Sequence, residues 1–190
     1  NFDGKEIDLT TPWKKIKMTD AIREYSGIDV MSMSDEELKS AVKKYGGEIK
    51  GDYIRGLAIN ELFELLVEDK LIAPTFVTHQ PVETTPLCKP DIEDERFLQR
   101  FELFINGTEF ANAYSESNDP VFQRKTLFEQ SLRREVDEEA PPMDENFVQA
   151  IEAGMPPAGG MGIGIDRLVM LLTGESSIRD ILLFPTMKPE

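Results

Sequence analysis

Apolar residues recur at helical spacing through the first 70 residues of the chain. The clearest case follows Ser34-Asp-Glu-Glu37, a capping box that predicts a helix start, and Gly46 marks the end of that helix. Its apolar face comprises Leu38, Ala41, Val42 and Tyr45. The same spacing predicts helices at about 19–27 and 57–69, the latter with inward-facing Leu62, Leu65 and Leu66. No pair of polar residues converges here, so we interpret residues 1–70 as a helical insertion and connecting segment.

From residue 71 onward the pattern changes to short β-rich runs separated by turns and helices. Strands are predicted at 72–78, 100–105, 108–116, 159–165 and 181–185. Asn106-Gly107, between two of these runs, predicts a two-residue hairpin loop. Helices are predicted at 119–138, 144–153 and 167–173, with Asp119 capping the first and Asp166 the third. This order of elements predicts an α+β fold, an antiparallel β-sheet with flanking helices.

Composition narrows the class of protein. The 190 residues are 40% hydrophobic and 30% charged, which suits an ordinary soluble domain, and the chain starts at Asn1 rather than Met, which indicates a fragment of something longer. The net charge of −15 repels a polyphosphate backbone, so we expect no direct nucleic-acid binding by this chain. The longest apolar run, Leu168–Leu172, is too short for a membrane helix, and we expect no membrane partner and a cytoplasmic location. The single cysteine and single histidine, Cys88 and His79, exclude disulfide frameworks and zinc sites.

Two glutamates share one face of the predicted hairpin. With a two-residue loop, Phe104 lies opposite Glu109 and Glu102 opposite Ala111, so the two glutamates are diagonal neighbours. Carboxylates this close repel each other unless a cation lies between them, and hard divalent metals with phosphate oxygens suit such a place. The pair therefore predicts a metal-nucleotide site. The alternative is a solvated sheet face with two exposed glutamates.

The second hairpin strand carries three polar residues with period two. Asn112, Tyr114 and Glu116 share a face, and an amide, a phenol and a carboxylate in a row suit recognition of a small zwitterion with a cationic tail. Glu109 and Asn112 are three residues apart, which in a regular strand puts them on opposite faces. We therefore predict a β-bulge or a sharp twist between them if both line one pocket.

The glycines at 160, 162 and 164 do not form a phosphate-binding loop. No Gly-Lys-Ser/Thr ending follows them, and Asp166 lies where an anion would approach. They provide a strand without side chains on which a flat ring or a ligand backbone can lie, and Arg167 just beyond can bond a phosphate. The alternative is a close-packed crossing in which Arg167 pairs with Asp166 or Asp180.

Two runs resemble a known enzyme class. Gly160-Met-Gly-Ile-Gly-Ile-Asp-Arg-Leu168 resembles the third signature motif of class II aminoacyl-tRNA synthetases. The run from Phe101 to Glu116, followed by Asn118-Asp-Pro120, is similar to the lysyl-tRNA synthetase members. Aspartyl and asparaginyl relatives carry a Gly-Gly-rich segment where this chain has Ala111-Asn-Ala-Tyr-Ser-Glu116. The resemblance covers essentially the whole chain.

This resemblance implies a role for eight residues. Glu102 and Glu109 would hold magnesium ions that bridge the ATP phosphates, and Arg167 would contact the γ-phosphate as the catalytic residue. Gly164 would lie in the ATP site, and the glycines at 162 and 164 would form a floor under adenine and the amino acid. The lysine pocket would be lined by Asn112, Tyr114, Glu116 and Gly162.

The implied reaction is attack of the lysine carboxylate on the ATP α-phosphorus, followed by transfer of lysine to tRNA(Lys). Such a step needs positioning and charge neutralisation rather than a protein nucleophile. The family's first and second motifs and its anticodon-binding domain precede the part that matches this chain. We therefore expect 71–190 to be the C-terminal half of the catalytic domain, the isolated chain to be inactive or nearly so, and the full-length protein to be a tRNA-binding homodimer.

Two other functions stay open. One is a transferase that attaches lysine or β-lysine to elongation factor P, although such paralogues tend to carry Ala where this chain has Gly162. The other is a non-catalytic paralogue, although those usually lose a metal carboxylate or the phosphate arginine. His79 and Glu83 lie near the pocket in the family, and for them a role at its rim competes with a surface or packing role.

Overall fold

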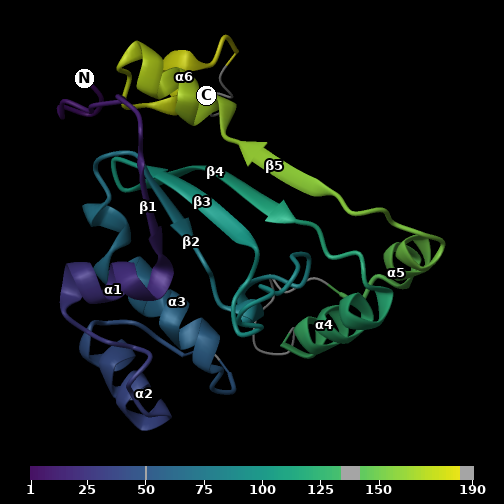
Figure 1. Ribbon diagram of the computed structural model, residues 1–190. Coiled ribbons are helices and arrows are strands. Elements are labelled where there is room, and N and C mark those ends of the chain that lie inside the picture. Colours follow the sequence, from purple (N-terminus) through teal and green to yellow (C-terminus); the bar gives the residue numbers. More distant parts are fainter. Residues whose placement is uncertain (50, 134–141, 185–190) are drawn as a thin grey trace, which may run out of the picture.

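A single five-stranded sheet organises the chain, in the order β1-β2-β3-β4-β5 (Figure 1). The computed structural model describes residues 1–49, 51–133 and 142–184. The strands are β1 Lys14–Lys17, β2 Thr75–Thr78, β3 Arg100–Ile105, β4 Thr108–Ser115 and β5 Gly159–Ile163. The β1–β2 pair is parallel and the other three pairs are antiparallel. The predicted α+β class is therefore confirmed, with a mixed rather than purely antiparallel sheet.

Helices fill three stretches of the chain. In Figure 1 the first three lie beside β1 and β2, the next two lie together at the lower right, and α6 lies at the top near the N-terminus. Those between β1 and β2 are α1 Met18–Ser26, α2 Asp35–Lys44 and α3 Arg55–Leu66, followed by the 3-10 turn η1 Glu68–Lys70. The 3-10 turn η2 Val82–Thr84 follows β2. The later helices are α4 Pro120–Leu132, α5 Glu145–Glu152, α6 Ile165–Thr173 and α7 Ile178–Ile181.

The main apolar core lies between α1–α3 and one face of the sheet, where Val77 and Phe104 contribute. The capping box of α2 is confirmed, because the Ser34 hydroxyl accepts from the Glu37 amide and the Glu37 carboxylate accepts from the Ser34 amide at 2.7 Å. Leu62 is fully buried as predicted, whereas Leu65 is 40% exposed and that prediction was wrong. The buried face of α3 is therefore narrower than the positions of its leucines indicate.

A second core covers the opposite face of the central strands. It contains buried Phe2, Leu103, Ile105, Phe110 and Ala111, with Trp13 and α6 residues packed against them. The N-terminal segment and α6 therefore close this side. The other side of β4 and β5 carries polar residues and glycines, and it is continuous with the side of β2 and β3 that α3 covers.

Several predicted boundaries change. The apolar run at 181–185 is not a strand among the described residues: α7 ends at Ile181, and Leu183 and Phe184 are 89% and 94% exposed. Gly164, not Asp166, is the N-cap of α6. Asp119 caps α4 as predicted and Asp144 caps α5, while the predicted end of the first of these helices, 134–138, lies outside the described residues.

Strand β1 was not predicted, and it joins residues of the 1–70 segment to the sheet of the 71–190 segment. The division of the chain into those two parts stays a prediction. Within the described residues, no helix has the length and apolar character needed to cross a membrane.

Candidate functional site

The β3–β4 hairpin contains the bulge that its residue spacing predicts. Asn106 and Gly107 form the two-residue loop, both with positive φ, and Phe104 pairs with Glu109. The register then shifts, so that Leu103 pairs with Ala111 and Glu102 with Asn112, which leaves Phe110 as the extra residue. The expected pairing of Glu102 with Ala111 was wrong by one position. The bulge brings Glu109 and Asn112 to the same face.

Cross-strand pairing assembles nine residues on one side of β3, β4 and β5, which we call the polar face. Its three rows follow from the register, since directly opposed residues share a face. The rows are Arg100, Tyr114 and Gly160; Glu102, Asn112 and Gly162; and Phe104 and Glu109, with Gly164 at the end of β5. We define the polar face as these residues without Phe104 and with Glu116, which follows β4 in the same alternation: Arg100, Glu102, Glu109, Asn112, Tyr114, Glu116, Gly160, Gly162 and Gly164.

Glu102 is an enclosed carboxylate of the polar face, with a side chain only 13% exposed. Arg100 donates to its Oε1 and the Gln80 amide lies 3.4 Å from its Oε2. Burial raises the pKa of Glu102, the Arg100 charge opposes that effect, and the Glu109 charge adds to it. The Glu109 carboxylate itself accepts a 2.8 Å hydrogen bond from the Asn112 amide. The two predicted metal carboxylates therefore lie close enough to repel each other.

A third carboxylate contributes to the negative potential beside this pair. Burial, together with the charges of the four neighbouring acids Glu64, Glu102, Asp69 and Glu109, raises the pKa of Glu68 to about 7. Glu68 lies in η1, directly after α3, the helix that packs beside the polar face. Sequence reasoning missed it, because it falls in a segment whose pattern indicates only a scaffold.

The other end of the polar face holds Tyr114 and Glu116 against a strand without side chains. The Arg100 guanidinium lies 5.2 Å from the centre of the Tyr114 ring. A Cβ built on Gly160 would overlap the Glu116 carboxylate, and one on Gly162 would lie 3.4 Å from Asn112 Oδ1. The missing side chain at Gly160 therefore makes the room that the Glu116 carboxylate occupies on this face of β5.

Arg167 reaches the same face from α6. Its guanidinium donates to the main-chain carbonyl of Glu109, and the amide of Gly164 donates to the carbonyl of Phe110 at 2.9 Å. Among the described residues Arg167 forms no ion pair with Asp166 or Asp180, the partners of the packing alternative. The arginine is thus held at the main chain of Glu109, with its side chain exposed.

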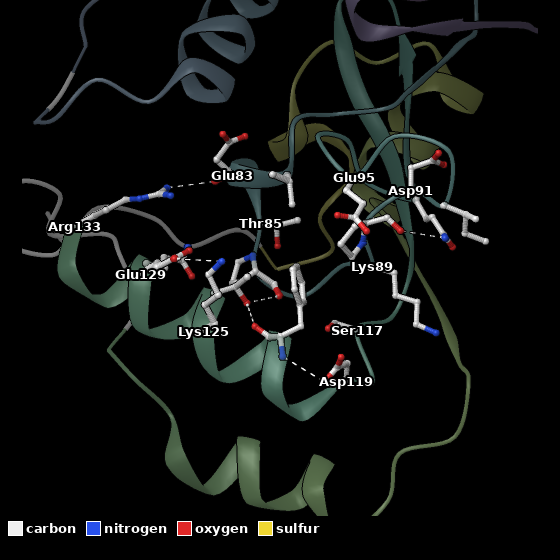
Figure 2. Close-up of a pocket in the computed structure, with 18 residues that line it drawn as sticks. Glu83, Thr85, Lys89, Asp91, Glu95, Ser117, Asp119, Lys125, Glu129 and Arg133 are labelled. Atoms are coloured by element: carbon white, nitrogen blue, oxygen red, sulfur yellow. Dashed lines mark hydrogen bonds and ion pairs between the residues drawn. The ribbon is translucent and has the colours of Figure 1, made fainter.

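A cavity of about 820 Å³ lies beyond the end of β4, between the loop at 82–99 and α4 (Figure 2). Glu83 lines this cavity, and Arg133 donates to the Glu83 carbonyl at 3.3 Å. No residue of the polar face lines the cavity. His79 bonds Thr78 at 2.9 Å, and burial lowers the pKa of its ring. The structure gives neither Glu83 nor His79 a place on the polar face.

The eight residues predicted for the site thus lie on the polar face or, for Arg167, beside it. Sequence reasoning missed Arg100 and Gln80, which hold Glu102 from two sides. The signal that could have found Arg100 is its position directly opposite Tyr114 in the hairpin register. Gln80 follows a strand in irregular backbone, and no periodicity predicts where its side chain lies.

Comparisons with known proteins identify the family of this chain. The sequence profile of the family described as tRNA synthetases class II (D, K and N) matches residues 1–188. The lysine–tRNA ligase of Syntrophomonas wolfei is 52% identical over the whole chain, and that of Listeria monocytogenes is 54% identical over 96% of it. The chain spans only 39% and 37% of the lengths of these two relatives. The match across nearly all of the chain shows that it belongs to the class II tRNA synthetase family.

Proposed function

We propose that this chain carries the lysine- and ATP-binding part of a lysine–tRNA ligase. The observation that supports this most directly is the polar face itself, which has two close carboxylates at one end and a carboxylate against bare strand β5 at the other. ATP with a divalent cation suits the first end, and an amino acid with a cationic side chain suits the second. Relatives with about 50% identity named lysine–tRNA ligase support the same assignment.

In this proposal Glu116 pairs with the ε-ammonium of lysine, because it is the carboxylate that Gly160 leaves room for. Tyr114 and Asn112 line the pocket beside it, two and four residues before Glu116 and on the same face. Gly162 and Gly164 form the floor under the amino acid and the adenine. A charge-assisted hydrogen bond to a fixed carboxylate distinguishes lysine from neutral amino acids of similar length.

The carboxylates at the other end of the polar face, Glu102 and Glu109, are donor groups that suit magnesium. Within the described residues no three His, Cys, Asp or Glu side chains are grouped to hold a metal by themselves. Magnesium does not require such a group, since it usually keeps several waters and is held by one or two carboxylates together with substrate phosphates. Glu102 and Glu109 would provide those carboxylates. When bound, the ion neutralises phosphate charge.

The residues of this chain then act by positioning and electrostatics. A lysine carboxylate oxygen attacks the α-phosphorus, the bond to the bridging oxygen breaks, and pyrophosphate leaves, so lysyl-adenylate forms without a protein nucleophile. Arg167, held at the carbonyl of Glu109, would bond the γ-phosphate and thereby orient the leaving group. The second step, transfer to tRNA(Lys), and assembly of a homodimer are proposed for the full-length protein, which we expect in the cytoplasm.

A chimera tests this function in a complete enzyme. The matching segment of the Listeria monocytogenes ligase is replaced by residues 1–190, and lysine-dependent exchange of pyrophosphate into ATP is measured. We expect exchange with lysine but not with β-lysine, arginine or aspartate, and its loss in Glu102→Gln and Glu109→Gln. Glu36→Gln, an exposed acid on α2, is the matched control.

Calorimetry of the 190-residue chain alone with Mg-ATP and lysine then shows how much of the site is preformed. We expect binding without measurable exchange in the isolated chain. A folded chimera that exchanges with β-lysine, or with none of the four amino acids, would contradict the proposal.

A further inference from the structure

We propose that Arg100 is a positioning residue that joins the two ends of the polar face, because its guanidinium donates to the Glu102 carboxylate and lies over the Tyr114 ring. This assignment rests on the function proposed above. It makes Arg100 a determinant both of how the ATP end is arranged and of how the lysine end is arranged. Arg100 itself does not have to touch either substrate.

Arg100 is built into the sheet rather than laid on the surface. Its side chain is 13% exposed, whereas that of Arg96, four residues earlier, is 70% exposed. Arginine is rarely enclosed to this degree without a specific task. Its Nε is also a buried donor without a hydrogen-bond partner among the described residues. Such an orphan is uncommon in folded proteins and is consistent with a group kept for function rather than stability.

The first contact fixes the carboxylate. Arg100 donates to Glu102 Oε1 and Gln80 donates to Oε2, so both oxygens are held from the protein side. Glu109 differs, since one hydrogen bond from Asn112 holds it. Groups that orient a metal-binding carboxylate in this way usually matter almost as much as the carboxylate itself. The Arg100 charge also favours the ionised form of Glu102, against the effect of burial.

The second contact fixes the aromatic ring. Arg100 and Tyr114 are directly opposed in the hairpin register, and the guanidinium lies 5.2 Å from the ring centre. On its other side Tyr114 is paired with Gly160, the glycine whose open space the Glu116 carboxylate fills. One row of the sheet therefore connects the guanidinium, the ring and the proposed ammonium-binding carboxylate.

The surroundings of the buried Cys88 thiol agree with this placement of Arg100 and Glu116. Burial raises the pKa of Cys88 to about 11, and among the nearby charges Arg100 lowers it while Glu116 raises it. The backbone agrees with this, because Cys88 forms a β-bridge with Glu116 and its thiol donates to the carbonyl of Gln99, next to Arg100, at 3.3 Å.

Nuclear magnetic resonance of the 190-residue chain tests the coupling directly. The probes are the Nε–H signal of Arg100 and the ring signals of Tyr114, followed while Mg-ATP is added without lysine. We expect both sets to shift together in the unmodified chain and the Tyr114 response to disappear in Arg100→Met. Arg96→Met is the matched control, since Arg96 also pairs with a carboxylate and lies 5.8 Å from a ring centre, that of Phe97.

An unchanged Tyr114 response in Arg100→Met would overturn the proposal, and so would a Tyr114 ring that does not respond in the unmodified chain. Circular dichroism of each variant establishes that it is folded. If Arg100→Met does not fold, Arg100→Lys takes its place, because lysine keeps the charge and lacks the planar group that lies on the ring.

Kinetics in the Listeria chimera separate positioning from a merely structural role. We expect Arg100→Met to raise both the magnesium concentration for half-maximal exchange and the KM for lysine, each about 10- to 100-fold. Arg100→Lys should restore most of the magnesium response and little of the lysine KM. A structural role would lower the amount of active enzyme and leave both quantities unchanged, which would overturn the proposal.

The two proposals fail in different ways. If the chimera with the unmodified segment is inactive, the proposed function is contradicted. The resonance experiment then still decides whether Arg100 links Glu102 to Tyr114. An active chimera, together with Tyr114 signals in the 190-residue chain that do not depend on Arg100, contradicts the proposal about Arg100 alone.

Discussion

Replacing Gly160 by alanine tests whether the bare strand β5 exists to make room for Glu116. The backbone of Gly160 does not have a positive φ, so alanine is compatible with its conformation. A Cβ at this position would overlap the Glu116 carboxylate far inside 3.0 Å, a distance that real Cβ contacts essentially always exceed. Since the neighbouring atom is the far end of a flexible side chain, the carboxylate has to move and the strand does not.

The magnitude follows from that displacement. A shift on the order of 1 Å in a group that positions a substrate costs on the order of 100-fold in rate. Loss of one hydrogen bond to a charged group costs about 1.5–3 kcal/mol, which corresponds to a dissociation constant for lysine about 10- to 150-fold weaker. Stability should change little, because a rotamer of Glu116 and no buried apolar side chain absorbs the clash. We therefore expect lost lysine affinity in a chain of nearly normal stability.

The assay is calorimetric titration of lysine, with the Tm measured on the same preparations. Gly159→Ala is the matched control: it changes the neighbouring glycine, whose added Cβ would meet the Tyr114 carbonyl at 3.4 Å, an ordinary contact. Lysine affinity should survive in the control. Equal lysine binding by both variants would refute the reasoning, and so would a Gly160→Ala chain that is strongly destabilised.

Three further predictions concern the scaffold and the acidic cluster. Ser34→Ala removes the cap of α2 and should lower the free energy of unfolding by about 1 kcal/mol in urea denaturation; an unchanged value would show that the capping box contributes nothing. Leu62→Ala should cost about 2–5 kcal/mol and Leu65→Ala much less, because the first leucine is fully buried and the second is 40% exposed; equal losses would contradict the observed stripe. Glu68 has a pKa of about 7 in the folded chain, against an ordinary value of 4.5. Between these two pH values the folded state keeps a proton that the unfolded state has released. The free energy of unfolding therefore falls as the pH rises from the lower value to the higher one. Glu68→Gln should therefore flatten the decline of Tm between pH 5 and 8, whereas Glu36→Gln should not.

Turn chemistry and strand alternation predicted the centre of the site. Asn106-Gly107 fixes the hairpin loop locally, and alternation then places Asn112 and Tyr114 on one face. The three-residue spacing from Glu109 to Asn112 is incompatible with a regular strand, so the bulge also follows from the sequence. These features depend on neighbours within a few residues, which a single sequence contains.

What the sequence did not reveal depends on distant contacts. Strand β1 is a short, mostly exposed edge segment, Lys14-Lys-Ile-Lys17, whose lysines conceal its pairing with β2. The apolar run after Ile181 has the composition of a buried strand, yet Leu183 and Phe184 have no apolar cover in the described chain. Arg100 looks like a surface residue, and only the sheet register shows that it is enclosed.

The bulge at Phe110 also limits how the length of β4 can vary during evolution. Deleting Phe110 or Ala111 would restore a regular ladder and leave every other residue of the strand on its present side. Losing one residue between Asn112 and Ser115 would instead invert part of the strand, sending polar groups into the core that contains Phe2 and Ala111. Functional variants of this hairpin should therefore tolerate a one-residue deletion at the bulge and nowhere else along the strand.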